Sequence, residues 1–300
     1  MSTENMVMNT GMVADQVNGP VDGRPDGKER KNRDEKKAGW RSHLALPGWM
    51  QSSSLPTLES GSIEYLKWMA ALFMLLDHFN AVIFAGGLAW MNGMGRMAFP
   101  LFAFIFALNL ARYDGLWDKW VANSWKLLLA GVAAMPAFIF MRETALQYDS
   151  WYPLNIMFTF FFAGTLLAAW QRLRHLRQAR RQGMPHGSRK YRLALSALAM
   201  LSALVVMFST EYEDAGLLMI LASFAFMRGR TSLLFVSLAI AYLIFWQGMA
   251  WWVLGAPMLV ALVMLAQSRW GDLPVPRVRH FFYIFYPAHL WVLMLLKLAL

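Results

Sequence analysis

Long apolar runs constrain the fold of this chain more than any other feature. From Ser62 onward, stretches close to the length of a membrane-spanning helix alternate with short segments that contain Gly, Pro or charged residues. A helix needs about 20 apolar residues to cross the hydrocarbon core of a bilayer. The composition agrees, because 58% hydrophobic and 15% charged residues depart from the roughly 45–50% and 25% that are typical of soluble domains. We therefore expect an all-α fold, a polytopic membrane helical bundle.

The runs predict about nine transmembrane helices. The weakest boundary is Gln247-Gly248, which alone separates the seventh run from the eighth. The predicted helices are Ser62–Ala85, Asn92–Arg112, Trp120–Met141, Trp151–Trp170, Leu193–Ser209, Ala215–Met227, Leu233–Trp246, Met249–Ala266 and His280–Leu300.

The positions of Lys and Arg predict how these helices are oriented. The most basic segment between two runs is Arg172–Arg192, and cytoplasmic loops carry the excess of positive charge. Alternation then places the N-terminus in the cytoplasm and the C-terminus outside, with the arginines of 228–230 and 269–279 also on the cytoplasmic side. The acid-containing segments 142–150 and 209–216 fall on the opposite side. Most of the net charge of +10 is therefore explained by arginines and lysines that set the orientation of the helices.

The basic segment also has a second interpretation. Arg177, Arg180 and Arg181 can bind acidic lipid headgroups or the phosphates of a nucleotide-like cofactor. A role in setting the orientation alone is the favoured interpretation, and cofactor binding by these three arginines is the alternative.

The first 60 residues differ from the rest of the chain. They are polar and include the charged stretch GKERKNRDEKK at Gly27–Lys37. Such a segment cannot bury enough apolar surface to offset the entropy lost on ordering. We predict a disordered, polar and basic cytoplasmic tail over 1–60, followed by a membrane domain over 61–300. Since the positive charges of the tail are interleaved with acids and lack aromatic neighbours, we expect no nucleic-acid partner.

Some ionisable residues within the runs have ordinary explanations. Glu64 and Lys67 are three residues apart on a helix and can pair with each other. Lys126 and Lys297 lie near helix ends, from which a long side chain can reach the membrane surface. These residues are expected to be structural.

Four other residues are harder to explain, namely Asp77, His78, Arg96 and His289. A charged side chain at the centre of a membrane helix costs about 2.5–3.5 kcal/mol on insertion scales. Asp77 and His78 are consecutive, so their side chains point about 100° apart and cannot face each other. Arg96 is the expected partner of Asp77, and His289 lies at a depth similar to that of His78. Either they form a buried ion pair and two structural histidines, or they line a polar cavity for reaction or transport, which we favour.

Several stretches resemble the TraX family, inner-membrane proteins of conjugative plasmids that N-acetylate pilin. The resemblance runs in order over Ser62–Leu300, and GR-x-AFP-x-F and YP-x-HL are its most specific elements. A more distant similarity is to integral-membrane acyltransferases. The resembling stretches are LKWMAALFMLLDH (66–78), GRMAFPLFAFIFALNLAR (95–112), NIMFTFFFAG (155–164), EYEDAGLLMIL (211–221) and YPAHLWVL (286–293).

The resemblance implies a multi-pass inner-membrane acetyltransferase with acetyl-CoA as donor and the N-terminal amine of pilin as acceptor. Such a transfer needs a base for the amine proton and a positive group for the developing oxyanion. We assign His78 as the base, Arg96 to the oxyanion, Asp77 as the acid beside the base, and His289 as a positioning group. The sequence has no Cys, so direct transfer is expected, and it has no metal-ligand motif, so no metal is expected.

Two other functions are compatible with the same residues. A transporter or proton-coupled permease would use Asp77, His78 and His289 as relay groups. Against it, the chain shows no repeated halves with paired broken helices. A non-catalytic factor for assembly of the pilus or type IV secretion apparatus is the third alternative.

Overall fold

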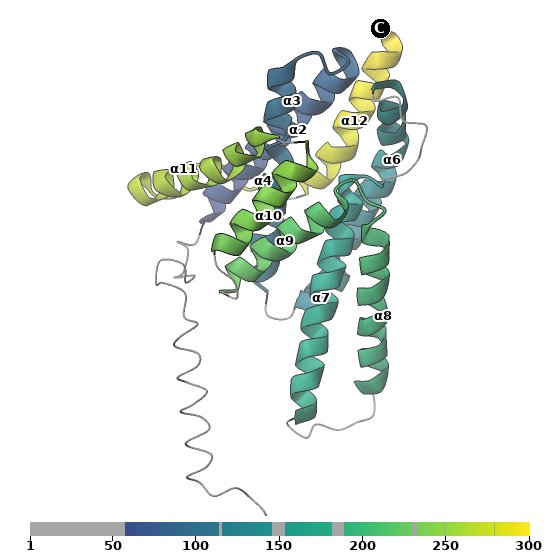
Figure 1. The fold of residues 1–300 in the computed structure, drawn as a ribbon, viewed down its shortest axis with the longest axis vertical. Helices are drawn as coiled ribbons and strands as arrows, with labels where there is room; N and C mark the ends of the chain where they lie inside the picture. The colour runs from purple at the N-terminus through teal and green to yellow at the C-terminus, as the bar shows by residue number, and fades with distance from the viewer. Residues whose placement is uncertain are drawn as a thin grey trace, which may run out of the picture. The chain divides into compact units, whose positions relative to one another are not determined.

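The computed structural model describes residues 58–113, 116–145, 154–181, 189–229, 233–248, 250–278 and 280–300. The predicted N-terminal tail lies almost wholly outside these residues. Within them the chain is helical, without a β-strand and with one isolated bridge between Leu154 and Thr210 (Figure 1). The helices are α2 (Ser60–Ile83), α3 (Ala89–Gly95), α4 (Ala98–Ala111), α5 (Leu116–Asn123), α6 (Trp125–Ala145), α7 (Ile156–Arg181), α8 (Arg189–Met207), α9 (Glu213–Met227), α10 (Leu233–Trp246), the 3-10 helix η2 (Trp251–Leu254), α11 (Gly255–Trp270) and α12 (Phe281–Ala299).

Every predicted helix has a counterpart, which confirms the all-α fold class for the described residues. Three predicted helices are divided, however. The second consists of α3 and α4, the third of α5 and α6, and the eighth of η2 and α11. Helix α7 is longer than predicted, because it continues from its apolar part through the basic sequence to Arg181.

Membrane character is supported by six helical stretches of the described chain that are long and apolar enough to cross a bilayer. Shorter apolar helices occur at Tyr191–Val206 and Leu233–Trp246. The total of nine spans and the cytoplasmic N-terminus remain predictions. The six stretches are Ser60–Ile83, Ala89–Ala111, Leu116–Glu143, Ile156–Gln178, Trp251–Trp270 and Phe281–Ala299.

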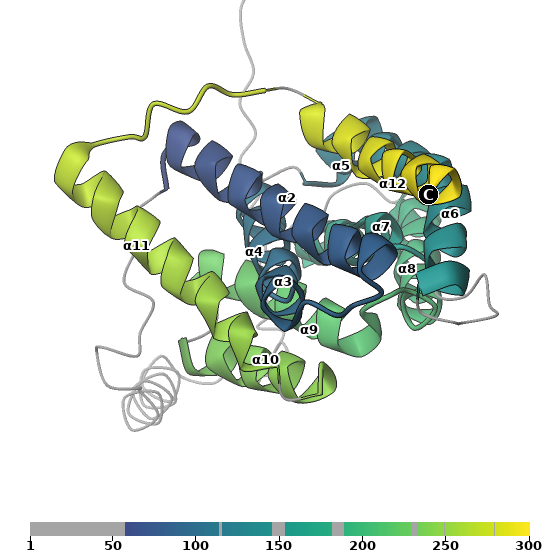
Figure 2. The same cartoon turned by 90° about the horizontal axis from the view of Figure 1, so that it is seen from above.

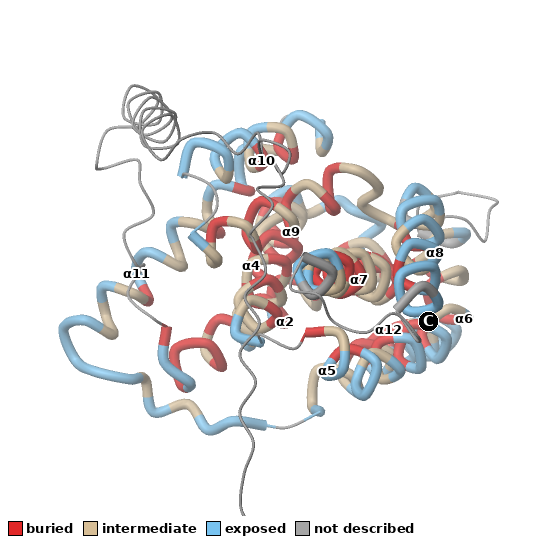
Figure 3. The backbone as a smooth tube through the Cα atoms, turned by 90° about the horizontal axis from the view of Figure 1, so that it is seen from below, coloured by how far each residue is buried: buried red, intermediate tan, exposed pale blue. Residues whose placement is uncertain are grey.

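The buried core is centred on α4. Its residues Phe99, Leu101 and Ile105 are almost completely buried, and α4 packs against α2 and α9 (Figure 3). In contrast, α8, α10 and α11 expose large apolar side chains on their outer faces. Leu198 and Phe245 are examples, with 65% and 70% of their surface exposed. Contiguous exposed apolar faces of this kind fit a lipid environment better than water.

Two helix pairings set the frame for the site. Helix α12 packs along both α2 and α6, although most of the chain separates α2 from α12 in sequence (Figure 2). Helices α7 and α8 form a hairpin and lie side by side along their length, and α7 also packs against α5, α6 and α9 (Figure 1). The contact between α2 and α12 therefore brings the first and last described helices together.

The start of α2 is held by a side chain from the other end of the chain. Both carboxylate oxygens of Asp272 accept hydrogen bonds of 2.9 Å, one from the backbone N–H of Gly61 and one from that of Ser62. The first turn of a helix has N–H groups without partners inside the helix, so these bonds cap α2. The bond from Gly61 is the main reason that the pKa of Asp272 lies below its usual value. A Cβ at Gly61 would collide with the carbonyl oxygen of Leu273, so the close approach requires glycine there.

Candidate active site

His78 of α2 and His289 of α12 form a direct hydrogen bond. The distance between Nδ1 of His78 and Nε2 of His289 is 2.8 Å. The two rings are coplanar within 2°, with centroids 5.1 Å apart, so they meet edge to edge rather than face to face. The sequence predicted that the two residues lie at a similar depth, and this contact confirms it.

The protons of this pair can be assigned from the next partner. The carbonyl oxygen of Phe285 lies 2.9 Å from Nδ1 of His289, and a carbonyl can only accept a hydrogen bond. In the neutral pair, Nδ1 of His289 therefore carries a proton and its Nε2 carries a lone pair. His78 must then donate from Nδ1, which leaves the lone pair of His78 on Nε2. The arrangement presents one basic nitrogen, Nε2 of His78, which forms no hydrogen bond with any described residue.

The two histidines differ in how tightly the protein holds them. His289 is buried, with 6% of its surface exposed. The ring of Phe285 stacks on it at a centroid distance of 5.0 Å, and Tyr286 meets it edge-on at 5.6 Å. His78 is only partly buried. His289 is thus the fixed member of the pair and His78 the more accessible one. Helix α12 continues through Pro287, so the proline does not break it next to the pair.

Asp77 and Arg96 lie close together but do not form a direct ion pair. Asp77 packs against Gly95 of α3, where any side chain would occupy the same space as the carboxyl group. Arg96 follows at the break between α3 and α4 and acts electrostatically on Asp77. No nitrogen of Arg96 is within 4.0 Å of an Asp77 oxygen. The predicted partnership therefore exists as an attraction over a longer distance, and not as a salt bridge.

The turn between α2 and α3 fixes these residues relative to each other. The side chain of Asn80 is buried and bonds both backbone groups of Leu88, donating to the carbonyl at 3.1 Å and accepting from the N–H at 3.0 Å. Ala85 and Gly86 have positive φ angles of 49° and 76°, which reverse the chain. Asn80 thus fastens α3 beside the end of α2 that carries the site.

Sequence reasoning assigned no role to Glu211, in the segment between α8 and α9. The bridge between Leu154 and Thr210 holds this segment beside the start of α7, with a 2.9 Å bond from the N–H of Glu211 to the carbonyl of Leu154. Removal from water raises the pKa of Glu211 to about 7, and the Arg142 guanidinium opposes the rise. Asp77 and Arg96 also act on this carboxyl group.

The carboxyl group of Glu211 lies within electrostatic range of Arg142, Asp77 and Arg96, and we call these two acids and two arginines the charge cluster. They come from α2, the α3–α4 break, α6 and the segment before α9. Glu211 lies outside the apolar runs, so it does not stand out as a charged residue within a predicted membrane helix. The one sequence signal was its place at the start of the stretch EYEDAGLLMIL.

The arginines predicted to bind a cofactor lie elsewhere. Arg177 is exposed on the C-terminal part of α7, and Arg180 and Arg181 belong to its last turn. Arg177 is 21 residues beyond Ile156, about 30 Å along the helix axis. Among the described side chains, no contact links Arg177 to the histidine pair, and cofactor binding by the three arginines stays a prediction.

Comparison with known proteins identifies the family. The sequence profile described as "TraX protein" matches residues 62–297, which is most of the 300-residue chain. The chain belongs to the TraX family. The TraX match includes the histidine pair and all four residues of the charge cluster, and it excludes the N-terminal tail.

Individual TraX proteins support this assignment. Protein TraX of Escherichia coli is 31% identical over 256 residues, which cover 83% of this chain and 92% of that protein. Protein TraX of Escherichia coli strain K12 is 30% identical over 175 residues, covering 58% of this chain and 59% of the relative. No solved structure matches the chain.

Proposed function

We propose that this protein is an inner-membrane acetyltransferase that transfers the acetyl group of acetyl-CoA to the N-terminal amine of conjugative pilin. The observation that carries the proposal is the chain of hydrogen bonds from His78 through His289 to the Phe285 carbonyl. It orients one imidazole and leaves a lone pair on Nε2 of His78. Membership of the TraX family supports the same function, and the resemblance implies the donor and the acceptor.

In the proposed reaction, the amine nitrogen attacks the thioester carbonyl carbon while Nε2 of His78 takes the amine proton. The C–S bond then breaks, and the CoA thiolate leaves with the proton that His78 returns. An N-terminal amine has an ordinary pKa of about 7.7–8.0, so a sizeable neutral fraction is present at neutral pH. A base of moderate strength is therefore sufficient.

His289 would act through His78. Its Nε2 accepts the Nδ1–H bond of His78, and this bond strengthens when His78 becomes a cation. Its own orientation is fixed by the Phe285 carbonyl and by burial. Arg96 would supply the positive field for the oxyanion, and Asp77 and Glu211 would act on it electrostatically without a direct ion pair.

The test is transfer by purified protein in detergent, with acetyl-labelled CoA and a peptide of the pilin N-terminus. The expected product is a peptide labelled on its α-amine, found by mass spectrometry. A peptide with a blocked N-terminus but the same lysines is the control. Label on lysines alone, or on neither peptide, would contradict the proposal.

A proton-coupled transporter is the second candidate. It is favoured by the two acids of the charge cluster, because Asp77 and Glu211 lie within electrostatic reach of each other and of Arg96, which stands at the break between α3 and α4. Proton-dependent uptake into proteoliposomes without peptide acetylation would support it. If the protein shows neither uptake nor acetylation, the result would support a non-catalytic role in pilus or type IV secretion assembly.

A further inference from the structure

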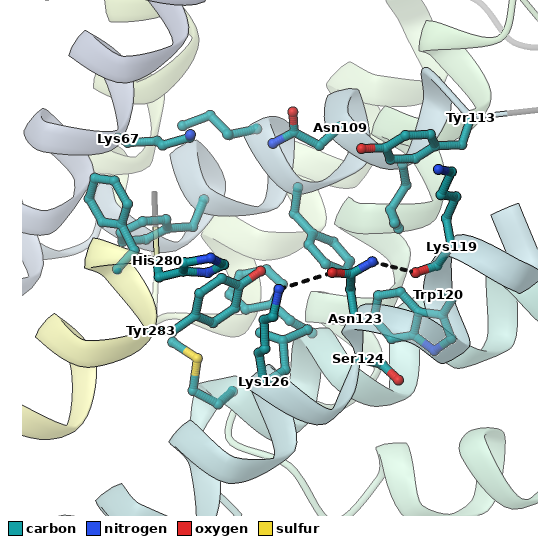
Figure 4. A pocket seen from close by; sticks show the side chains of 18 of the residues that line it. Lys67, Asn109, Tyr113, Lys119, Trp120, Asn123, Ser124, Lys126, His280 and Tyr283 are labelled. Carbon is teal, nitrogen blue, oxygen red and sulfur yellow. Dashed lines mark hydrogen bonds between the residues drawn. The ribbon is translucent and has the colours of Figure 1, made fainter. Parts of the chain in front are cut away.

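A basic pocket of about 570 Å³ lies between α4, α5, α6 and α12 (Figure 4). Four cationic side chains line it: Lys67, Lys119, Lys126 and Arg277. None of the described residues that line it is Asp or Glu. A concave site with several positive charges and no negative one selects for an anionic ligand.

Two of the four cations are free to bind such a ligand. Lys67 is paired with Glu64 at 2.7 Å, and Lys126 donates to the side-chain oxygen of Asn123 at 3.0 Å. Lys119 and Arg277 form no hydrogen bond or ion pair through their side chains with other described residues, and both are exposed at the pocket. An arginine fork and a lysine ammonium are the usual phosphate ligands of proteins.

Aromatic residues form part of the remaining lining, beside aliphatic residues such as Leu110 and Leu127 and the amides of Asn109 and Asn123. Trp120, Phe160, Phe282 and Tyr283 contribute rings to the wall, and Figure 4 shows Tyr283 and His280 on the side opposite Trp120 and Asn123. Aromatic side chains offer stacking surfaces to flat rings such as nucleobases. The combination fits a ligand that carries both phosphates and an aromatic base, which is a nucleotide.

The position of the pocket relates it to the histidine pair. Its lining residues Lys67 and Tyr283 belong to α2 and α12, the two helices that carry the histidines. Lys67 precedes His78 by 11 residues and Tyr283 precedes His289 by six, which are about 16 Å and about 9 Å along the helix axes. The charge pattern also predicts that all four cations lie at cytoplasmic helix ends, where acyl-CoA thioesters are available.

We propose that this pocket binds the nucleotide part of an acyl-CoA donor, with Lys119 and Arg277 on its phosphates. The proposal rests on the acetyltransferase function given above. In CoA a long pantetheine arm separates the phosphates and adenine from the thioester, as the separation between pocket and histidines requires. The basic end of α7 is then not needed for donor binding.

The test is binding of unacylated CoA to the purified full-length protein in a neutral detergent, measured by calorimetry. Each charge-assisted phosphate contact is worth roughly tenfold in affinity. The double variant K119Q/R277Q removes two such contacts and should therefore raise the Kd for CoA by roughly 100-fold. R269Q, which replaces an exposed arginine in the last turn of α11, is the matched control and should leave the Kd unchanged. Because Lys119 and Arg277 are exposed, the double variant should fold, which size-exclusion chromatography checks.

A Kd that the double variant leaves unchanged would overturn the proposal, as would an equal loss of affinity in R269Q. A loss of affinity in R177Q alone would place the donor phosphates on α7 and would also overturn it. A phospholipid headgroup is the other source of phosphate. If the double variant loses co-purified phosphatidylglycerol while CoA affinity holds, the pocket is a lipid site and the proposal fails. Failure of the proposed function would give a different result. If CoA binding depends on Lys119 and Arg277 but the peptide is not acetylated, the pocket binds CoA and the proposed acetyltransferase function is wrong.

Discussion

The hydrogen bond between His78 and His289 defines which nitrogen of each ring can accept a proton. The Phe285 carbonyl fixes the proton of His289, and His289 in turn fixes that of His78. A lone imidazole in a protein cavity would be free to change tautomer or rotate. Here two bonds of 2.8 Å and 2.9 Å orient the basic nitrogen, as the proposed role of His78 as a general base requires.

This arrangement predicts an Nδ1–H tautomer for His78. Free histidine in water favours the opposite tautomer, so the prediction is specific to the structure. Nitrogen-15 NMR of histidine-labelled protein in micelles should show a protonated Nδ1 and an unprotonated Nε2 for His78, assigned by the signal that disappears in His78→Gln. A protonated Nε2 on neutral His78 would mean that the bond runs from His289 to His78, and the roles given to the two residues would be reversed.

The two histidines should also respond differently to substitution. His78→Gln removes the base and should reduce the rate per mole of folded protein by about 10²–10⁴-fold, the usual range for a general base. His289→Gln should lose less activity, or lose folded protein along with it, because His289 is buried and acts through His78. His175→Gln, on an exposed site of α7, is the control and should behave as wild type. A larger loss of activity for His289→Gln at full expression would mean that His289 is the base and His78 the positioning group.

At the scale of elements, the α2–α12 contact depends on how α2 is anchored. Its first turn is capped by Asp272 rather than by a residue of its own. The hydrogen bonds to Asp272 also link the segment before α12 to the start of α2. The cap thus restrains both helices that carry the histidines.

Asp272→Ala should lower the Tm of the protein in detergent, and Asp272→Asn should lower it less, since an amide oxygen can still accept one of the two bonds. The carboxylate has a depressed pKa in the folded protein, mainly because the N–H of Gly61 donates to it. Its stabilisation is therefore present above the unfolded pKa of about 3.9 and is lost as the pH falls through the lower folded value.

The measurement is the Tm from tryptophan fluorescence at pH 7 and at pH 3. The difference between wild type and Asp272→Ala should be smaller at pH 3. An equal difference at both pH values would show that the charge of Asp272 does not act as a cap.

The elements were largely predictable from hydropathy because each helix must bury or expose an apolar surface. The helix breaks at Arg96 and Ser124 were not predictable, because the apolar runs continue across them. Only tertiary contacts determine where these helices break. The similar depth of His78 and His289 followed from counting residues along their helices. Their direct bond, the longer separation of Asp77 and Arg96, and the position of Glu211 depend on how the helices pack, which the sequence pattern does not specify.

At the scale of the whole molecule, the number of spans determines the side on which each end lies. Six helical stretches satisfy the length and hydropathy of a span in the described chain, whereas the charge pattern and runs predict about nine. An odd number places the two ends of the chain on opposite sides of the membrane, and an even number places them on the same side.

Reporter fusions can decide between these counts. A reporter after Gly183 should be cytoplasmic and one after Tyr148 periplasmic, because positive charge sets the orientation. A reporter after Leu300 should be periplasmic if there are nine spans. A cytoplasmic C-terminal reporter would support an even count, and cytoplasmic signals from both Gly183 and Tyr148 would overturn the predicted orientation.

In the proposed reaction, Nε2 of His78 takes the proton of an attacking amine, and the rate of acetyl transfer reports on this step. Wild-type protein and His78→Gln, matched for folded protein by size-exclusion chromatography, would be given acetyl-labelled CoA and the pilin peptide. We predict label on the peptide α-amine with wild type and a loss of about 10²–10⁴-fold in its rate of appearance with His78→Gln. Equal rates for the two proteins, or no label with well-folded wild type, would contradict the account.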